Sequence, residues 1–376
     1  MIGRFIFAFP SPHERKGGEG LSPGGGMDLT SKIYVAGHSG LAGSAVCRQL
    51  QAKGYRNLIV RAHSQLDLID KSEVEGFFSR ENPEYVFLCA GKVGGIHANH
   101  TYPVDFLLNN LRMQNNVIEA AWRHGVKGLL FLASSCIYPR NAAQPLREEY
   151  LLTGPLEPTN QPYAIAKIAG IELCKAFNRQ YDTRFLSVMP TNLYGPNDHY
   201  DLENSHLLPA LIRKFHLGRL AAQGDALGIR HDEACYGPIP EDVMAGLKKE
   251  GGPVIQLWGT GTPHREMMHA EDMADGCVFL MERLERLFAG RRKLLSENPV
   301  INIGCGKDST IRELADAVAR VVGFMGDVTW DAARPDGTPR KLLDVSVMSE
   351  LGWESKISLE QGLRTTYEDY LRRLQL

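Results

Sequence analysis

The strongest constraint on the fold is a regular alternation, from Lys32 onward, between short apolar runs and longer segments with helical character. The apolar runs are almost continuous, which is typical of strands buried on both faces of a parallel sheet. These runs are KIYVAG (32–37), NLIVRA (57–62), YVFLCAG (85–91), GLLFLASS (128–135) and RFLSVMPTN (184–192). The helix-like segments lie between them, at 41–53, 71–80, 103–124 and 160–180. We therefore predict an α/β fold with a doubly wound parallel sheet, because parallel strands need crossover helices.

Later segments predict a smaller C-terminal lobe. Strand-like runs occur at 253–258, 299–304 and 341–346, and helix-like segments at 271–286, 309–322 and 359–373. We expect residues 31–195 to form the sheet domain, completed by parts of 253–305, and residues 196–376 to form mainly the smaller lobe. The segment 218–252 is polar and rich in glycine, so we expect a surface excursion there.

The first thirty residues differ from the rest of the chain. Their only apolar stretch, IFAF, is followed at once by proline, charges and glycines, and is too short for a signal peptide or a membrane span. We expect residues 1–30 to be a disordered leader, with Met27 as a candidate start of translation.

Composition excludes several classes of function. The 42 basic and 44 acidic residues are mixed along the chain, without the basic cluster that nucleic-acid binding requires. No stretch is long and apolar enough for a membrane partner. The seven cysteines are scattered and form no CxxC pair or metal-ligand spacing, which indicates a reducing cytoplasm without disulfides or a structural metal.

A glycine-rich turn follows the first strand and opens the first helix. It reads Gly37-His38-Ser39-Gly40-Leu41-Ala42-Gly43, with GxxGxxG spacing. Glycines there permit a tight turn and let backbone N–H groups at the helix N-terminus approach a pyrophosphate. The position of this motif predicts a Rossmann domain that binds a dinucleotide.

The end of the second strand should distinguish NADP from NAD. An enzyme that uses NAD commonly places Asp or Glu there, whereas a cation suits the 2′-phosphate of NADP. This chain has Arg61 and His63, and no acidic residue before Asp67. We therefore favour NADP, with the alternative that Arg61 is only a solvated charge at the strand end. Asp67 is a candidate acceptor for the adenine amino group.

A tyrosine and a lysine with catalytic spacing follow. Tyr163 and Lys167 are four residues apart in YAIAK, on one face of a predicted helix. A phenol that exchanges a proton near neutral pH needs its pKa of about 10 lowered, and an adjacent ammonium has that effect. Ser134 or Ser135, after the fourth strand, supplies a hydroxyl where ligands bind in open parallel sheets. YxxxK alone is common, but the three motifs in this order are specific.

The order of these motifs resembles the extended short-chain dehydrogenase/reductase family, whose members act on nucleotide sugars. The resemblance covers essentially residues 32–376 and is densest at 91–103, 134–139, 156–174, 188–198, 204–215 and 335–346. These stretches are similar to members that epimerise GDP-4-keto-6-deoxy-D-mannose at C3 and C5 and then reduce it at C4 with NADPH. The resemblance implies a Rossmann domain for NADP, a C-terminal lobe for the GDP-sugar and a homodimer.

The resemblance also implies roles for individual residues. Ser134, Tyr163 and Lys167 match the reductase triad, and Cys136 and His206 match an acid/base pair for epimerisation. The implied cofactor-binding residues are Gly37, Ser39, Gly40, Leu41, Ala42, Gly43, Arg61, His63, Asp67, Ala90, Leu132, Ala133, Ser135, Pro190, Asn192 and Leu193. The implied substrate-binding residues are Lys214, Trp258, Arg265 and Lys341. Ser39, His63 and Lys214 stand where the family commonly has arginine, so Arg61 is the clearest cation for a 2′-phosphate.

The Cys/His pair suits a double inversion. In a 4-keto sugar the ketone acidifies the protons on C3 and C5, and each inversion needs one group to remove a proton and another to return one. We expect Cys136 to be the base, as a thiolate favoured by nearby positive groups, and His206 the acid, with the reverse assignment open at each centre. A cysteine that is only a small hydrophobe and a histidine that caps a helix are the simpler alternatives.

Dehydration is disfavoured, because related dehydratases place acidic residues after the fourth strand, where this chain has Ser135-Cys136. Two other functions stay open. Another nucleotide-sugar epimerase/reductase of the same family is one alternative. A non-catalytic NADP-binding regulatory module is the other, and the intact triad disfavours it.

Overall fold

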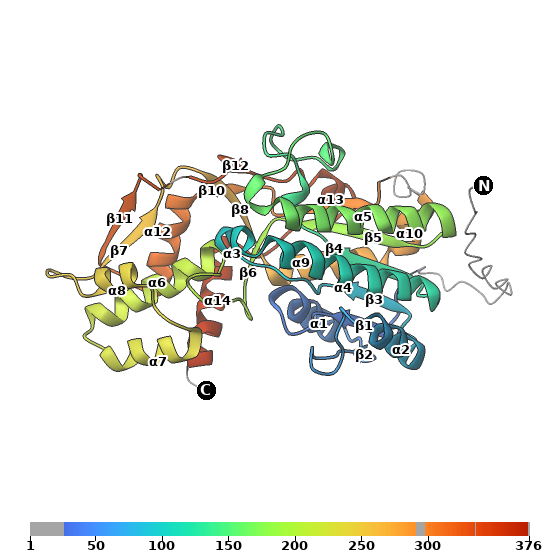
Figure 1. The fold of residues 1–376 in the computed structure, drawn as a ribbon, viewed down its shortest axis with the longest axis horizontal. Helices are drawn as coiled ribbons and strands as arrows, with labels where there is room; N and C mark the ends of the chain where they lie inside the picture. Colours follow the sequence, from blue (N-terminus) through green and yellow to red (C-terminus); the bar gives the residue numbers. More distant parts are fainter. Residues whose placement is uncertain (1–25, 291–297, 335, 375–376) are drawn as a thin grey trace, which may run out of the picture.

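The computed structural model describes residues 26–290, 298–334 and 336–374 (Figure 1). Six parallel strands form the main sheet in the order β2-β1-β3-β4-β5-β9. Their bounds are Ile33–Ala36 (β1), Leu58–Ile59 (β2), Tyr85–Leu88 (β3), Gly128–Leu132 (β4), Phe185–Pro190 (β5) and Val300–Ile303 (β9). The order reverses between β1 and β3, where ligands bind in doubly wound sheets. The predicted fold class is confirmed.

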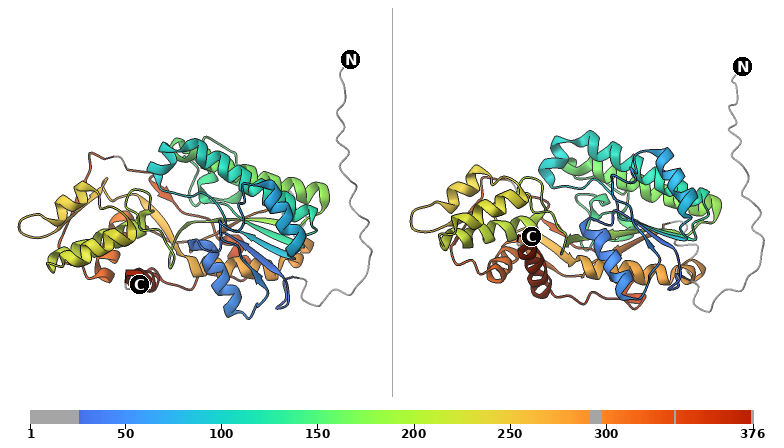
Figure 2. Two further views of the ribbon diagram at one scale, coloured as in Figure 1. Left: turned by 60° about the horizontal axis from the view of Figure 1, so that its bottom comes forward. Right: turned by 90° about the horizontal axis from the view of Figure 1, so that it is seen from below.

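Successive side chains of each strand enter different cores. Ile33 and Val35 pack toward α1 (Leu41–Ala52), α9 (Ala270–Glu282) and α10 (Leu284–Gly290). Tyr34 and Ala36 pack toward α2 (Lys71–Glu81), α4 (Pro103–Arg123) and α5 (Gln161–Tyr181). Figure 2 shows these two groups of helices on opposite faces of the sheet. Both faces exclude water, which explains why the strands are almost entirely apolar.

The smaller lobe is built from short strands and helices around a third core. Its strands are β6 (Asn192–Tyr194), β7 (Val254–Trp258), β8 (His264–His269), β10 (Asp308–Thr310), β11 (Asp327–Asp331) and β12 (Arg340–Lys341). Strand β8 pairs with β6, β10 and β12, and β7 pairs with β11. Its main helices are α6 (Leu207–Ala222), α12 (Ile311–Val322) and α14 (Leu359–Leu374), and Phe215, Leu257, Val318 and Leu363 lie in its core.

Several short elements complete the chain. They are the helices α3 (Ile96–Thr101), α7 (Ala226–Tyr236), α8 (Glu241–Leu247) and α13 (Ser346–Glu350), and the 3-10 turns η1 (Ser135–Ile137), η2 (Glu148–Tyr150) and η3 (Pro158–Asn160). The predicted helix 271–286 is two helices, because the backbone leaves helical geometry at Arg283.

Two regional expectations need correction. The polar segment 218–252 is mostly helical: it contains the end of α6 and all of α7 and α8. It is not only a surface excursion, since Val243 and Leu247 join the core of the lobe and Asp232 is fully buried. Residues 1–25 of the predicted leader 1–30 lie outside the described residues. Its last part is ordered, because Met27 is 7% exposed and packs with the first core.

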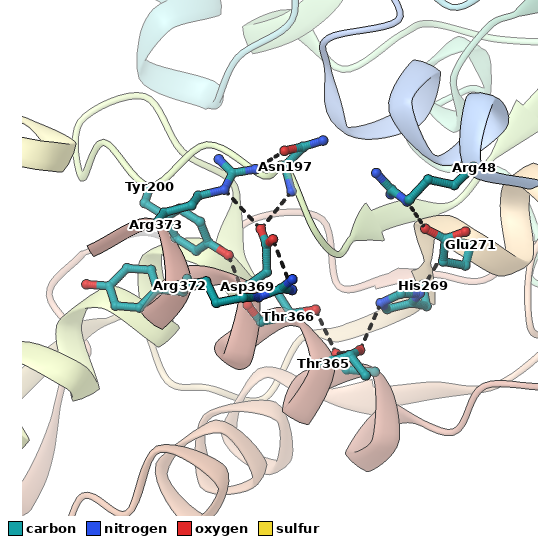
Figure 3. A network of polar contacts seen from close by, with 12 residues as sticks. Arg48, Asn197, Tyr200, His269, Glu271, Thr365, Thr366, Asp369, Arg372 and Arg373 are labelled. Carbon is teal, nitrogen blue, oxygen red and sulfur yellow. Dashed lines mark hydrogen bonds and ion pairs between the residues drawn. The ribbon is translucent and has the colours of Figure 1, made fainter. Parts of the chain in front are cut away.

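A chain of polar contacts ties the last helix to the loops that leave the sheet (Figure 3). His269, just before α9, contacts the Thr365 hydroxyl of α14 through Nε2 at 3.3 Å. The carboxylate of Asp369 accepts the backbone N–H of Asn197 at 3.1 Å. Helix α14 is therefore fastened to the segment that follows β6 and to the end of β8, where the chain enters α9.

Candidate active site

The glycine turn after β1 has the geometry that a dinucleotide requires. Gly37 has φ +83°, and a Cβ there would lie 2.7 Å from the backbone nitrogen of Ala90. A Cβ on Gly43 would lie 2.1 Å from the carbonyl oxygen of Gly37, so helix α1 packs directly on the turn. At Gly40, the N-cap of α1, the nearest such atom is 3.7 Å away, and no side chain caps the helix. These residues fit a dinucleotide pyrophosphate at the start of α1.

The residues predicted at the adenosine end lie beside β2. The Arg61 guanidinium donates to Glu81 Oε1 at 2.5 Å and to the carbonyl oxygen of Val60 at 2.8 Å. His63 is 82% exposed in its side chain, and its Nδ1 lies 3.8 Å from the Asp67 carboxylate. Arg61 is therefore a cation already paired with a carboxylate, a partner that its sequence position does not indicate.

The remaining predicted cofactor residues gather along the carboxyl edge of the sheet. Ser39, Leu41 and Ala42 belong to the glycine turn and the first turn of α1, Ala90 follows β3, Leu132, Ala133 and Ser135 end or follow β4, and Pro190, Asn192 and Leu193 end β5 or lie in β6. Asn192 donates its side-chain N–H to the carbonyl oxygen of Glu266 at 2.9 Å. The topology thus brings these sequence-distant residues to one edge.

Cys136 lies in the turn that follows β4. The hydroxyl of Ser134 accepts the backbone N–H of Cys136 at 3.3 Å and caps η1. The Cys136 sulfur accepts hydrogen bonds from Asn160 Nδ2 at 3.3 Å and from Lys341 Nζ at 3.4 Å. Burial raises the pKa of the Cys136 thiol, but the Lys341 charge and the Ser134 contact outweigh it, so the pKa is below its ordinary value. Cys136 is therefore more than a small apolar residue.

Lys167 projects from α5 toward the end of β4. Its ammonium donates to the carbonyl oxygen of Leu132 at 2.9 Å and lies 4.8 Å from the centroid of the Phe131 ring. Burial lowers the pKa of Lys167 to about 8, and the nearby thiol of Cys89 opposes that shift. The distance from Nζ to the centroid of the Tyr163 ring is 5.8 Å.

The phenol of Tyr163 lies near Cys136 and Ser134, and its pKa is shifted in the opposite direction from the predicted one. Burial, and then the proximity of Cys136, raise the pKa of the Tyr163 phenol above its ordinary value, and Ser134 opposes this only in part. The charge of Lys167 does not offset this rise in the pKa of Tyr163, and its ammonium donates to a carbonyl oxygen of β4. Tyr163 is therefore a protonated phenol at neutral pH, the form that donates a proton.

His206 stands at the N-cap position of α6, but its side chain makes no capping hydrogen bond. The residue is exposed to solvent. Protein atoms around the ring partly desolvate it, and this, followed by the positive charges of Lys341 and His199, lowers the pKa of His206. Lys341 thus acts electrostatically on both members of the predicted acid/base pair.

Arg265 and Lys341 are neighbours across two strands. They are directly paired in the parallel register of β8 and β12. The Arg265 guanidinium donates to the carbonyl oxygens of Thr338 at 2.6 Å and His264 at 2.8 Å. These two backbone acceptors fix the direction of the Arg265 side chain. Arg265 is therefore linked through its strand neighbour Lys341 to Cys136, a predicted catalytic residue.

The other two predicted substrate residues surround β7. Trp258 ends that strand, is 60% exposed, and faces the guanidinium of Arg334 at 4.8 Å from the ring centroid. Lys214 projects from α6; burial lowers its pKa, and the carboxylate of Asp242 opposes the shift. An exposed indole beside a guanidinium suits a flat nucleotide base. Among the described residues, neither Trp258 nor Lys214 contacts Cys136 or Tyr163.

Three residues in the site were not singled out by the sequence. Asn160 lies at the N-cap of α5, and besides its bond to Cys136 it has a buried Oδ1 without a partner. Asn110 is 2% exposed and bonds both backbone groups of Lys92, beside the ammonium of Lys167. Glu266 is fully buried in β8. The sequence signal that could have found these residues is a polar side chain within a segment that is otherwise apolar or helical.

Within residues 26–290, 298–334 and 336–374, no cluster of His, Cys, Asp and Glu side chains is arranged to hold a metal ion. In the same ranges no helix is both long and apolar enough to cross a membrane.

Comparison with known proteins places this site in a family. Residues 33–304 match the NAD dependent epimerase/dehydratase family. Two Arabidopsis thaliana proteins are each 50% identical to this chain: putative GDP-L-fucose synthase 2, over 93% of this chain and 94% of its own, and GDP-L-fucose synthase 1, over 92% and 95%. A GDP-D-glycero-L-gluco-heptose synthase from Campylobacter jejuni, solved in the presence of NADPH, superposes with a TM-score of 0.82 at 39% identity, over 92% of this chain and 99% of that one. The chain belongs to the NAD dependent epimerase/dehydratase family.

Proposed function

We propose that this chain is a GDP-L-fucose synthase. It converts GDP-4-keto-6-deoxy-D-mannose to GDP-L-fucose by epimerisation at C3 and C5, followed by reduction at C4 with NADPH. The observation that carries the proposal is the position of the Cys136 thiol, which shares a site with the Tyr163 phenol and faces an ammonium. Curated relatives with this activity at 50% identity support the same conclusion.

Epimerisation uses the thiol and the imidazole. The Cys136 thiolate takes the proton from C3 or C5, and the bonding pair moves toward the C4 oxygen. His206 returns a proton to the opposite face of the carbon. Thiols and imidazoles ordinarily titrate near enough to neutrality for this exchange.

Reduction uses the triad. The glycine turn around Gly37 and Gly40 would hold NADPH, which would supply the hydride for C4 when bound. The phenol of Tyr163 donates its proton to the C4 oxygen, and its raised pKa keeps that proton available at neutral pH. Ser134 orients the same oxygen, and Lys167, held by Leu132, stabilises the developing charge near the phenol.

The preference for NADP rests on Arg61. The 2′-phosphate would share the guanidinium with Glu81, because different edges of a planar guanidinium can each donate to an acceptor. Arg61→Ser should therefore weaken NADPH more than NADH. Glu81→Gln is the matched variant: it frees the guanidinium and should tighten NADPH selectively. Titration of both nucleotides against both variants measures this, and equal changes for NADPH and NADH would contradict the assignment.

We propose a homodimer formed through α4 and α5. These helices lie side by side and expose Val104 (67%), Leu108 (39%) and Ile165 (42%) (Figure 1). Apolar side chains grouped on adjacent helices are typical of a surface that a second copy covers. We also propose a cytoplasmic location, because all seven cysteines lie in the described residues and are free thiols.

Incubation with GDP-4-keto-6-deoxy-D-mannose and each reduced nicotinamide nucleotide tests the function. The expected product with NADPH is GDP-L-fucose. Formation of a C4-reduced sugar without inversion, or turnover only of GDP-heptoses, would instead indicate a related reductase. NADPH binding without any turnover would indicate a regulatory module.

Two variants separate the two half-reactions. Cys136→Ser should sharply reduce exchange of solvent deuterium into C3 and C5. Tyr163→Phe should reduce hydride transfer and leave this exchange largely intact. Equal loss of both activities in each variant would refute the division of roles.

A further inference from the structure

Lys341 reaches the catalytic cysteine from the other lobe. It lies on β12, at the junction of the two lobes (Figure 1), and is 205 residues away from Cys136 in the sequence. Its Nζ donates to the Cys136 sulfur at 3.4 Å. The resemblance implied only a substrate contact for this lysine, so the contact with the thiol needs its own explanation.

The backbone around Lys341 is held on both sides. Lys341 pairs in register with Arg265 of β8. The next backbone N–H, of Leu342, donates to Gln144 Oε1 at 2.9 Å, and that of Leu343 donates to the buried carboxylate of Glu266 at 2.9 Å. A lysine side chain loses substantial conformational entropy when it is fixed, but here its stem starts from a rigid strand. The ammonium is therefore presented to the sulfur by the fold.

The groups around the sulfur favour a negative charge. Asn160 Nδ2 donates to the sulfur at 3.3 Å, and the Ser134 hydroxyl accepts the Cys136 backbone N–H. The titratable groups that face the thiol are the Lys341 ammonium and the Tyr163 phenol, while His206 lies in the field of the same ammonium. Within the described residues, Lys341 makes no ion pair with a carboxylate, so its charge is not neutralised before it reaches the sulfur.

We propose that Lys341 is the charge partner of Cys136, and that its ammonium holds this side chain as the thiolate that abstracts the C3 and C5 protons. The thiol proton leaves to solvent when the pair forms. The thiolate then takes a proton from carbon and becomes a thiol again. The catalytic part of this inference rests on the proposed function; the thiolate state does not.

The direction of the electrostatic effect agrees with this role. Burial alone would raise the pKa of Cys136, and the charge of Lys341 is the main influence that reverses it. An opposite charge within about 4–6 Å shifts a pKa by about 1–3 units. Removal of the ammonium should therefore return Cys136 to the behaviour of a buried thiol.

The test follows alkylation of Cys136 by iodoacetamide as a function of pH, in protein without any sugar nucleotide. Mass spectrometry of the Cys136 peptide separates this thiol from the other six cysteines. Lys341→Met should raise the midpoint of the pH profile by about 1–3 units. Lys341→Gln, which keeps a hydrogen-bond donor without the charge, should do the same, and Lys341→Arg should keep the midpoint near the wild-type value.

Arg340→Met is the matched control. Arg340 is the neighbouring residue of β12, but its guanidinium pairs with Asp308 at 2.5 Å and not with the thiol. Arg340→Met should leave the midpoint of the Cys136 alkylation profile unchanged. A wild-type midpoint in Lys341→Gln, or an equal shift in Arg340→Met, would overturn the inference. Shifted midpoints in a protein that fails to turn over the 4-keto substrate would refute the proposed function and leave the Lys341–Cys136 pair standing.

Discussion

Replacement of Asp232 by leucine should destabilise the smaller lobe by about 3–5 kcal/mol, the usual cost of leaving one charge of a buried pair alone. Arg213 and Asp232 are both fully buried, with Nε and Oδ1 2.8 Å apart. The other guanidinium N–H groups donate to the carbonyl oxygens of Tyr200, Tyr236 and Gly237, which are neutral. Without Asp232 these three acceptors remain but no counter-charge does.

The change is measured by urea unfolding, followed by tryptophan fluorescence and circular dichroism. A double-mutant cycle with Arg213→Met tests the cause. The double variant should be more stable than Asp232→Leu alone, because apolar side chains can replace a buried ion pair. Glu360→Gln is the control: in its pair with Arg364 the side chains are 70% (Glu360) and 62% (Arg364) exposed, so its loss should leave the stability almost unchanged. A loss below about 1 kcal/mol for Asp232→Leu, or additive losses in the double variant, would refute the reasoning.

Three further predictions concern a buried acid, the glycine turn and the dimer. Burial raises the pKa of Asp198 to about 7, so the folded state holds this proton more tightly than the unfolded state; the resulting stability is complete below about pH 4 and is lost as the pH rises through 7. Asp198→Asn should therefore flatten the fall in melting temperature between about pH 4 and pH 7, and parallel curves would contradict this. Gly43→Ala should lower the melting temperature and abolish NADPH binding, since its Cβ would lie 2.1 Å from a backbone oxygen, whereas Gly40→Ala should fold normally and only weaken binding. Calorimetry and nucleotide titration measure both, and a normally stable Gly43→Ala would be inconsistent with the packing argument. Val104→Glu combined with Leu108→Glu should produce monomers in analytical ultracentrifugation, while an unchanged sedimentation coefficient would exclude α4 from the interface.

Sequence periodicity predicted the main sheet well because the signal is local and strong. The strands are buried on both faces and are therefore largely apolar, as the runs around Ile33 and Leu130 are. The short strands β6, β8, β10 and β11 were missed, since three to six residues with polar or mixed composition resemble loops. The segment 218–252 was misread because its helices are polar on most faces and bury few residues, Asp232 among them.

The sequence alone determined the parallel sheet, the glycine turn and the helical pairing of Tyr163 with Lys167, since each depends on residues a few positions apart. Only the tertiary structure decided the charges that these groups experience. It paired Arg61 with Glu81, directed Lys167 at the Leu132 carbonyl, and brought Lys341 to Cys136. Such contacts depend on how two lobes pack and on which of several acceptors lies nearest, and no local pattern carries that information.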